Sequence, residues 1–185
     1  MKSICVYCAS SSGIDPSYRL VAEALGRDVG SRGWAVVYGG AHVGLMGLVA
    51  DSCLAAGGQV FGIIPRSLKE REIAHLGLTR LEIVDSMHER KARMTELADA
   101  FVALPGALGT LDELCEALTW AQLGIHHKPV YVLNVNGYWT GFLEFLDRAV
   151  REGFLKLENR TLVQAVDGVE ELMACLASDN QYYVK

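Results

Sequence analysis

The amino-acid sequence predicts an α/β fold, namely a doubly wound parallel sheet in a three-layer α/β/α arrangement built as a single domain. Short apolar runs alternate along the chain with amphipathic segments of helical period. Strands that alternate with helices in this way form parallel sheets that are covered on both faces. The length of 185 residues is typical of one domain. In such sheets ligands bind beyond the carboxyl ends of the strands, which is where we expect the functional site.

The apolar runs are the predicted strands, and the amphipathic segments are the predicted helices. The strands cover residues 3–9, 34–38, 59–64, 81–84, 100–104, 130–133 and 161–166. The helices cover residues 16–30, 45–56, 87–98, 111–123, 141–152 and 169–177.

Helix caps and glycines set the boundaries in the first half of the chain. Asp15 and Ser17 are the two candidates that mark the start of the helix at 16–30, and Gly33 follows its end. The helix at 45–56 is rich in small residues, and a glycine pair ends it.

Prolines and a change of composition set the boundaries in the second half. Pro65 stops the strand at 59–64, and another proline introduces the strand at 130–133. Residues 68–75 form a charged segment, and the tail at 178–185 is expected to be peripheral.

The composition excludes several classes of function. Hydrophobic residues make up 51% of the chain and charged residues 21%, as in an ordinary globular protein with a large core. A net charge of −5 does not favour binding to a nucleic-acid backbone. No apolar run approaches the roughly 20 residues that cross a bilayer, so we expect no membrane partner. The amino terminus is interpreted as a strand rather than a signal peptide, and the expected location is cytoplasmic.

The cysteines form no recognisable metal or disulfide framework. They stand at positions 5, 8, 53, 115 and 175. Cys5 and Cys8 have the C-x-x-C spacing, but residues three apart on a strand point to opposite faces. We therefore expect buried thiols and no metal site.

Residues 99–123 contain the main candidate for a binding site. The turn at 105–110 lies between an apolar strand and an amphipathic helix and carries two glycines. Unpaired amides at the positive end of a helix bind anions, above all phosphate. Thr110 is expected to cap this helix. The turn lacks the G-x-G-x-x-G and P-loop patterns, which favours nucleoside monophosphates or sugar phosphates over NAD or ATP.

Charged residues next to this turn are the candidates for catalysis. Glu113 follows Thr110 by three positions, so its carboxylate would lie beside a bound ribose phosphate. There it could bind ribose hydroxyls, stabilise an oxocarbenium-like sugar or position water. Asp112 and Glu116 are the runners-up for this role. Arg90 begins another helix at the same edge, where a guanidinium would pair with an anion or brace a carboxylate.

Four segments resemble the motifs of a known family. YGGAHVGLMG at 38–47 is similar to its YGGGxxGLMG, and MHERKARM at 87–94 is similar to its MHxRKxxM. PGALGTLDE at 105–113 is similar to its PGGxGTxxE, and TWAQLGIHHKP at 119–129 also matches. On these motifs the chain is identified as a member of the LOG (Lonely Guy) family, the cytokinin riboside 5′-monophosphate phosphoribohydrolases.

This resemblance implies a Rossmann-like fold and an obligate homodimer with active sites at or near the subunit interface. It also implies cleavage of the N-glycosidic bond of AMP or of N6-substituted AMP, with no cofactor. By matching motif positions, Arg90 and Glu113 are the catalytic pair. The residues expected to bind the substrate are Ser10, Gly40, Glu72, Met87, Lys91, Gly106, Ala107, Leu108, Gly109, Thr110 and Thr119.

Two departures from the family motifs keep alternatives open. Ala41 and Ala107 stand where the family has glycine, and a Cβ at position 107 would crowd the phosphate if that turn needs a positive φ. One alternative is a nucleotide-binding sensor or carrier without turnover. Another is a hydrolase that removes phosphate instead. A lysine decarboxylase is disfavoured, because no lysine stands out in a cleft context to hold pyridoxal phosphate.

Overall fold

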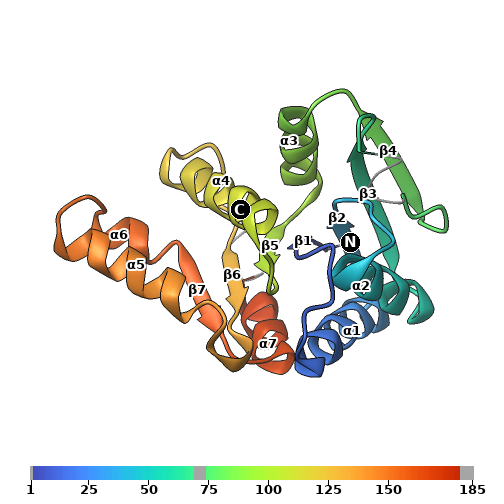
Figure 1. Cartoon of the computed structure of the whole chain (residues 1–185), viewed down its shortest axis with the longest axis horizontal. Coiled ribbons are helices and arrows are strands. Elements are labelled where there is room, and N and C mark those ends of the chain that lie inside the picture. Colours follow the sequence, from blue (N-terminus) through green and yellow to red (C-terminus); the bar gives the residue numbers. More distant parts are fainter. Residues whose placement is uncertain (1, 69–73, 180–185) are drawn as a thin grey trace.

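The computed structural model describes residues 2–68 and 74–179, which form a seven-stranded parallel sheet between two layers of helices (Figure 1). The strands are β1 (Ser3–Tyr7), β2 (Ala35–Tyr38), β3 (Gln59–Pro65), β4 (Arg80–Val84), β5 (Ala100–Ala103), β6 (Val130–Leu133) and β7 (Val163–Val166). The helices are α1 (Pro16–Ser31), α2 (Gly44–Ala55), α3 (Met87–Leu97), α4 (Leu108–Gln122), α5 (Thr140–Arg151), α6 (Leu157–Arg160) and α7 (Val169–Asp179), with a short 3₁₀ helix, η1 (Val135–Gly137). The predicted α/β/α class is confirmed.

The strand order places the functional edge of the sheet. The order is β4-β3-β2-β1-β5-β6-β7, so the chain winds in opposite directions from β1 and from β5. The two strands pair in parallel, with Tyr7 opposite Ala103. Ligands of doubly wound sheets bind at such a reversal, outside the carboxyl ends of the strands. The loop after β1 and the turn after β5 therefore meet at the expected binding site, and Ala9 N–H donates to Pro105 O there at 3.3 Å.

Each face of the sheet has its own core. Helices α1, α2 and α7 cover one face, while α3, α4 and α5 cover the other (Figure 1). Alternate residues of β1 serve the two cores, with Ile4 and Val6 on the first face and Cys5 and Tyr7 on the second. Burial of both faces explains why the strands appear as continuous apolar runs in the sequence.

The prediction of buried thiols is confirmed for Cys5, Cys8 and Cys53, whereas Cys115 is exposed and Cys175 is partly exposed. Cys5 and Cys8 belong to different cores, and both are free thiols. Desolvation by burial raises the pKa of both well above the ordinary value, which keeps them protonated. Neither thiol is therefore a nucleophile.

Most predicted boundaries agree with the structure within two residues, but three differences stand out. Helix α4 begins at Leu108, three residues before the predicted start. The predicted strand at 3–9 ends at Tyr7, since the following residues bond to the turn after β5 rather than to a neighbouring strand. The short elements η1 and α6 were not predicted, because three or four residues are too few to show a helical period.

Two further features of the fold are a buried histidine and the character of the helices. His126 is buried, and one ring nitrogen lies 2.9 Å from Ala117 O while the other accepts from Lys128 N–H at 3.2 Å. It therefore anchors the loop between α4 and β6. Within residues 2–68 and 74–179, no helix has the length and apolar character needed to span a membrane.

Candidate active site

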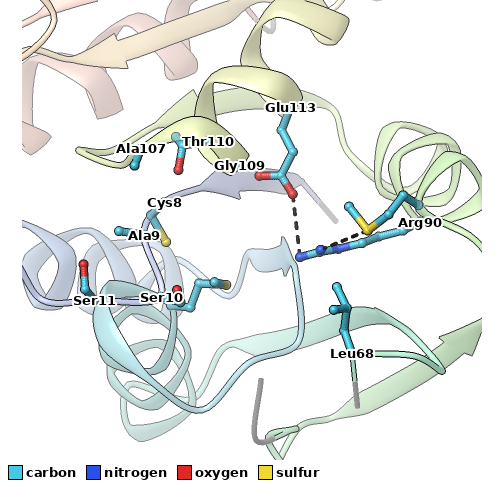
Figure 2. Close-up of a pocket in the computed structure, with 12 residues that line it drawn as sticks. Cys8, Ala9, Ser10, Ser11, Leu68, Arg90, Ala107, Gly109, Thr110 and Glu113 are labelled. Atoms are coloured by element: carbon cyan, nitrogen blue, oxygen red, sulfur yellow. Dashed lines mark hydrogen bonds and ion pairs between the residues drawn. The ribbon is translucent and has the colours of Figure 1, made fainter. Parts of the chain in front are cut away.

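A cleft of about 240 Å³ opens at the β1/β5 edge of the sheet (Figure 2). Five parts of the chain contribute to it: the loop after β1, the start of α2, the segment after β3, the start of α3 and the first turns of α4. The lining residues are Cys8, Ala9, Ser10, Ser11, Met46, Leu68, Met87, Arg90, Ala107, Gly109, Thr110 and Glu113. Polar groups gather at the end near α4, whereas Leu68 lies at the other end (Figure 2).

The amino terminus of α4 forms the polar end of the cleft. Ala107 is the N-cap, and no side chain caps the helix. The first amides of a helix have no acceptor within that helix, so those of Leu108, Gly109 and Thr110 are free to bind an anion. Ser10 and Ser11 face this end across the cleft (Figure 2). The geometry fits a phosphate group.

The predicted capping role of Thr110 is wrong. The helix starts earlier than its apolar pattern indicated, so Thr110 lies in the first turn rather than at the N-cap. Its side chain packs against Gly106, where a Cβ would come within 2.0 Å of Thr110 Oγ1. Gly106 is thus required for close packing of the turn on the helix.

A buried ion pair lies at the centre of the cleft. Arg90 Nη2 and Glu113 Oε1 are 3.6 Å apart, and their side chains are only 6% and 10% exposed (Figure 2). Within the described structure Arg90 Nε has no hydrogen-bond partner, and Nη1 meets only the sulfur of Met87, at 3.8 Å. A buried guanidinium with unused donors is costly, so it is suited to receive an acceptor from a ligand.

Gly39 makes room for this arginine. A Cβ at Gly39 would lie 1.9 Å from Arg90 Nη2. The first glycine of the 38–47 motif therefore permits the guanidinium to lie over the end of β2. Ser86 also helps, because its hydroxyl accepts from Glu89 N–H at 3.1 Å and fixes where α3 begins.

Lys91 does not line the cleft, and its ammonium is directed toward two carboxylates. Its Nζ lies 3.1 Å from Asp112 Oδ2 and 2.8 Å from Glu116 Oε2, which ties α3 to α4. Desolvation lowers the pKa of Lys91, but the hydrogen bonds with Glu116 and Asp112 outweigh it and raise that pKa above its ordinary value. Lys91 is therefore a cation that braces the helix carrying Glu113.

The structure brings most of the predicted site residues together. Those that line the cleft are Ser10, Met87, Arg90, Ala107, Gly109, Thr110 and Glu113. Gly40, Gly106, Leu108, Lys91 and Thr119 are not among the lining side chains. Gly40 lies behind the cleft against β3, and Thr119 lines a separate hollow between α4 and α5. Glu72 lies outside the described residues.

The two alanines that replace family glycines fit without strain. Ala107 has φ −105°, and its exposed methyl leaves the cleft open. Ala41 is fully buried, and among the described residues only Asn136 is a non-glycine with positive φ. Neither position needs the left-handed backbone that favours glycine.

Sequence reasoning missed several lining residues, including Ser11, Met46 and Leu68. Met46 comes from α2, whose first amides bond to the loop after β1: Leu45 N–H to Ser11 O at 3.2 Å and Met46 N–H to Ala9 O at 3.4 Å. The Gly-rich turn before α2 is the sequence feature that could have pointed to Met46, because this turn packs directly on the loop after β1.

We predict that Gly44→Ala destabilises the protein by about 3 kcal/mol or more, because strain and a clash add together. Gly44 has φ +63°, and a Cβ there would lie 2.2 Å from the backbone carbon of Ser10. Gly57 is the matched control, with φ +86° and open space around it, so Gly57→Ala costs only about 1 kcal/mol. Urea denaturation measures both values. Equal losses would contradict the close approach of α2 to the loop.

One group of side chains within the described residues has the donor types of a metal site. Donor atoms of His42, Asp51 and His75 lie within 4.8 Å of one another. Both ring nitrogens of His75 are engaged, Nε2 with Asp51 Oδ1 at 2.8 Å and Nδ1 as acceptor from Gly77 N–H at 3.0 Å. The buried ring thus ties the segment before β4 to α2, and we assign no metal to it.

Comparison with known proteins places the chain in a family. A family model described as possible lysine decarboxylase matches residues 46–176. The cytokinin riboside 5′-monophosphate phosphoribohydrolase LOG7 of Arabidopsis thaliana is 49% identical over 172 residues, which cover 93% of this chain and 79% of that protein. The rice protein of the same activity, LOG from Oryza sativa subsp. japonica, is 48% identical over 93% of this chain and 71% of its own length.

A solved structure shares the fold at lower identity. The molybdenum cofactor binding protein from the phototrophic bacterium Rippkaea orientalis superposes with a TM-score of 0.72 at 20% identity, covering 96% of this chain and 97% of that chain. This likeness shows the fold alone. With nearly half of the residues identical to curated phosphoribohydrolases over most of its length, the chain belongs to the LOG family.

Proposed function

We propose that the protein hydrolyses the N-glycosidic bond of N6-substituted adenosine 5′-monophosphates and of AMP, releasing the free base and ribose 5-phosphate. Its relatives at 48–49% identity carry the name of this activity. The observation that carries the proposal is the buried Arg90–Glu113 pair beside an uncapped helix terminus in one cleft. A nucleotide needs both parts, one for its phosphate and one for its anomeric carbon.

The cleft suggests one orientation for the substrate. The phosphate binds at the amides of Leu108, Gly109 and Thr110, where the helix terminus favours negative charge. The ribose then lies over Glu113, and the base extends toward the apolar side chains of Met87 and Leu68. An N6 substituent of isoprenoid type matches that apolar end.

Glu113 supplies the negative charge that the reaction requires. As the bond between C1′ and the base nitrogen breaks, the bonding electrons leave with the base and positive charge develops on the ribose. The Glu113 carboxylate stabilises that charge and orients water toward C1′. The water oxygen bonds to C1′, and its proton passes to the departing base. Arg90 pairs with this carboxylate at 3.6 Å and directs it into the cleft.

The alternatives are less well supported. The carrier without turnover was suggested by Ala41 and Ala107, and both alanines fit without strain. A molybdenum cofactor binding protein shares the fold at 20% identity, whereas a phosphoribohydrolase matches at 49%. The decarboxylase needs a Schiff-base lysine, and no lysine lies among the described residues that line the cleft.

The test is an assay of AMP and N6-isopentenyl-AMP with chromatographic detection of free base. We expect base and ribose 5-phosphate in equal amounts, with no effect of a chelator. Release of inorganic phosphate that chelator abolishes would indicate the phosphate-cleaving alternative instead. Tight binding without any product would indicate the carrier.

We further propose a homodimer, which the family resemblance implies. Helix α5 has no buried residue, and Phe145, Phe154 and Leu157 are 64%, 89% and 68% exposed on the surface of α5, α6 and their connection. A second copy of the chain would cover this apolar surface. Thr119 borders the adjoining hollow, so its predicted contact with substrate requires a second copy to lie against α4.

We predict that Phe145→Lys converts the dimer to a monomer, because a charge would then have to be buried in the interface. Light scattering on the protein as it elutes from a size-exclusion column gives the mass of the assembly. The control is Arg151→Lys, which lies on α5 like Phe145. Phe61→Lys would not serve as a control, because the Phe61 side chain packs in a core. A wild-type protein with the mass of one chain would overturn the dimer.

A further inference from the structure

A second hollow lies behind the polar end of the cleft, at the amino terminus of α4. Its volume is about 110 Å³. It shares Ala9, Ser11 and Ala107 with the cleft, but it is also lined by Tyr18 and Tyr138. The turn after β5 therefore forms a wall with the nucleotide cleft on one side and these two tyrosines on the other.

The hydroxyl of Tyr138 holds this wall in one orientation. It donates a hydrogen bond to Gly106 O at 2.7 Å, across 32 positions of the sequence. In a planar trans peptide the carbonyl of one residue and the amide of the next point in opposite directions. Because the Gly106 carbonyl is turned toward Tyr138, the N–H of Ala107 points to the other side of the wall, where the cleft lies.

That amide is available to a ligand. Within residues 2–68 and 74–179, the Ala107 N–H donates to no backbone or side-chain acceptor. It precedes the free amides of the first turn of α4, so the four amides from Ala107 to Thr110 are successive donors around one point. Such successive amides form an anion-binding concavity.

Tyr138 is itself held in place by a strained segment. Asn136 has φ +53°, the left-handed region that side chains rarely adopt. Its Nδ2 donates to Asp15 Oδ2 at 3.1 Å and to Ser17 Oγ at 2.9 Å, which ties the segment to the start of α1. Strain of this kind persists where the surroundings over-determine a conformation, and it concentrates at functional sites.

We propose that Tyr138 is a positioning residue of the nucleotide site. Its hydroxyl fixes the Gly106–Ala107 peptide so that the Ala107 amide joins the donors that bind the 5′-phosphate. This inference rests on the proposed function, because it assigns the second hollow a role in holding that phosphate.

Tyr138→Phe removes the hydroxyl and keeps the ring. We expect kcat/KM for AMP to fall about tenfold, the value of one hydrogen bond to a charged group, and the change to lie in KM with kcat nearly unchanged. The Kd of ribose 5-phosphate, measured by calorimetry, should rise by the same factor. Activity on adenosine, which has no phosphate, should not change.

Tyr18→Phe is the matched control. Tyr18 packs edge-to-face against Tyr138 with ring centroids 5.7 Å apart, so this variant also removes one tyrosine hydroxyl from the residues that line the second hollow. It should leave KM and Kd unchanged. Equal losses on AMP and on adenosine would show that Tyr138 has only a structural role, and wild-type KM and Kd in Tyr138→Phe would overturn the inference.

A second variant and the binding measurement keep the test decisive. Asn136→Gly removes the side-chain tether and should raise KM for AMP in the same direction by a smaller factor, even if Tyr138→Phe folds poorly. The Kd measurement is independent of turnover. If the wild-type protein releases no base, the proposed function fails, while the effect of Tyr138→Phe on ribose 5-phosphate binding still decides the role of Tyr138.

Discussion

Glu113→Gln is expected to lower kcat for AMP by about 10²–10³-fold while KM changes little. The amide has nearly the volume of the carboxylate but no charge to stabilise the developing cation on the ribose. Steady-state kinetics with detection of free base gives both constants. Because Glu113 is buried beside Arg90, the neutral side chain also leaves the guanidinium without its anion.

The control for this prediction is Glu170→Gln, the same chemical change on the exposed start of α7. It should leave kcat within about twofold of wild type, as is usual for surface substitutions. If Glu113→Gln keeps the wild-type kcat, Glu113 is not the catalytic carboxylate, and Glu116 and Asp112 become the candidates for that role.

Arg90→Met should lower kcat to a similar degree as Glu113→Gln. It should also lower the free energy of unfolding by about 3 kcal/mol. The substitution leaves the buried Glu113 carboxylate without the guanidinium 3.6 Å away. The double variant Arg90→Met/Glu113→Leu removes both charges and should recover most of that stability, although it remains inactive. Urea denaturation of the three variants gives the cycle.

A double variant that is less stable than Arg90→Met would contradict this interpretation. The loss in Arg90→Met would then come from lost packing and not from a buried charge without its partner. The expected pattern indicates that Arg90 and Glu113 are retained for catalysis at a cost in stability.

Much of the fold follows from the sequence because its strands are buried on both faces. Runs such as those of β5 and β6 are continuously apolar, which is typical of the centre of a parallel sheet. The sequence also predicts the edge at which ligands bind, since the turns after β1, β2 and β5 all follow strands. Short elements such as α6 and η1 have no period to detect.

The candidate site was predictable only in part. Arg90, Glu113 and Thr110 stand in motifs, and the structure places all three in the cleft. The exact start of α4 was missed, because Leu108 and Gly109 precede the apolar face of the helix. Contacts between distant segments, such as Tyr138 with Gly106, depend on loop conformations that no periodicity encodes. The ammonium of Lys91 is likewise directed by tertiary contacts with Asp112 and Glu116.

The most direct test of the central claim is a crystal structure of the Glu113→Gln variant with AMP bound. We expect the phosphate within about 3 Å of the amides at the start of α4, and C1′ next to residue 113. A phosphate that lies away from these amides, or a ribose directed away from residues 90 and 113, would contradict the account.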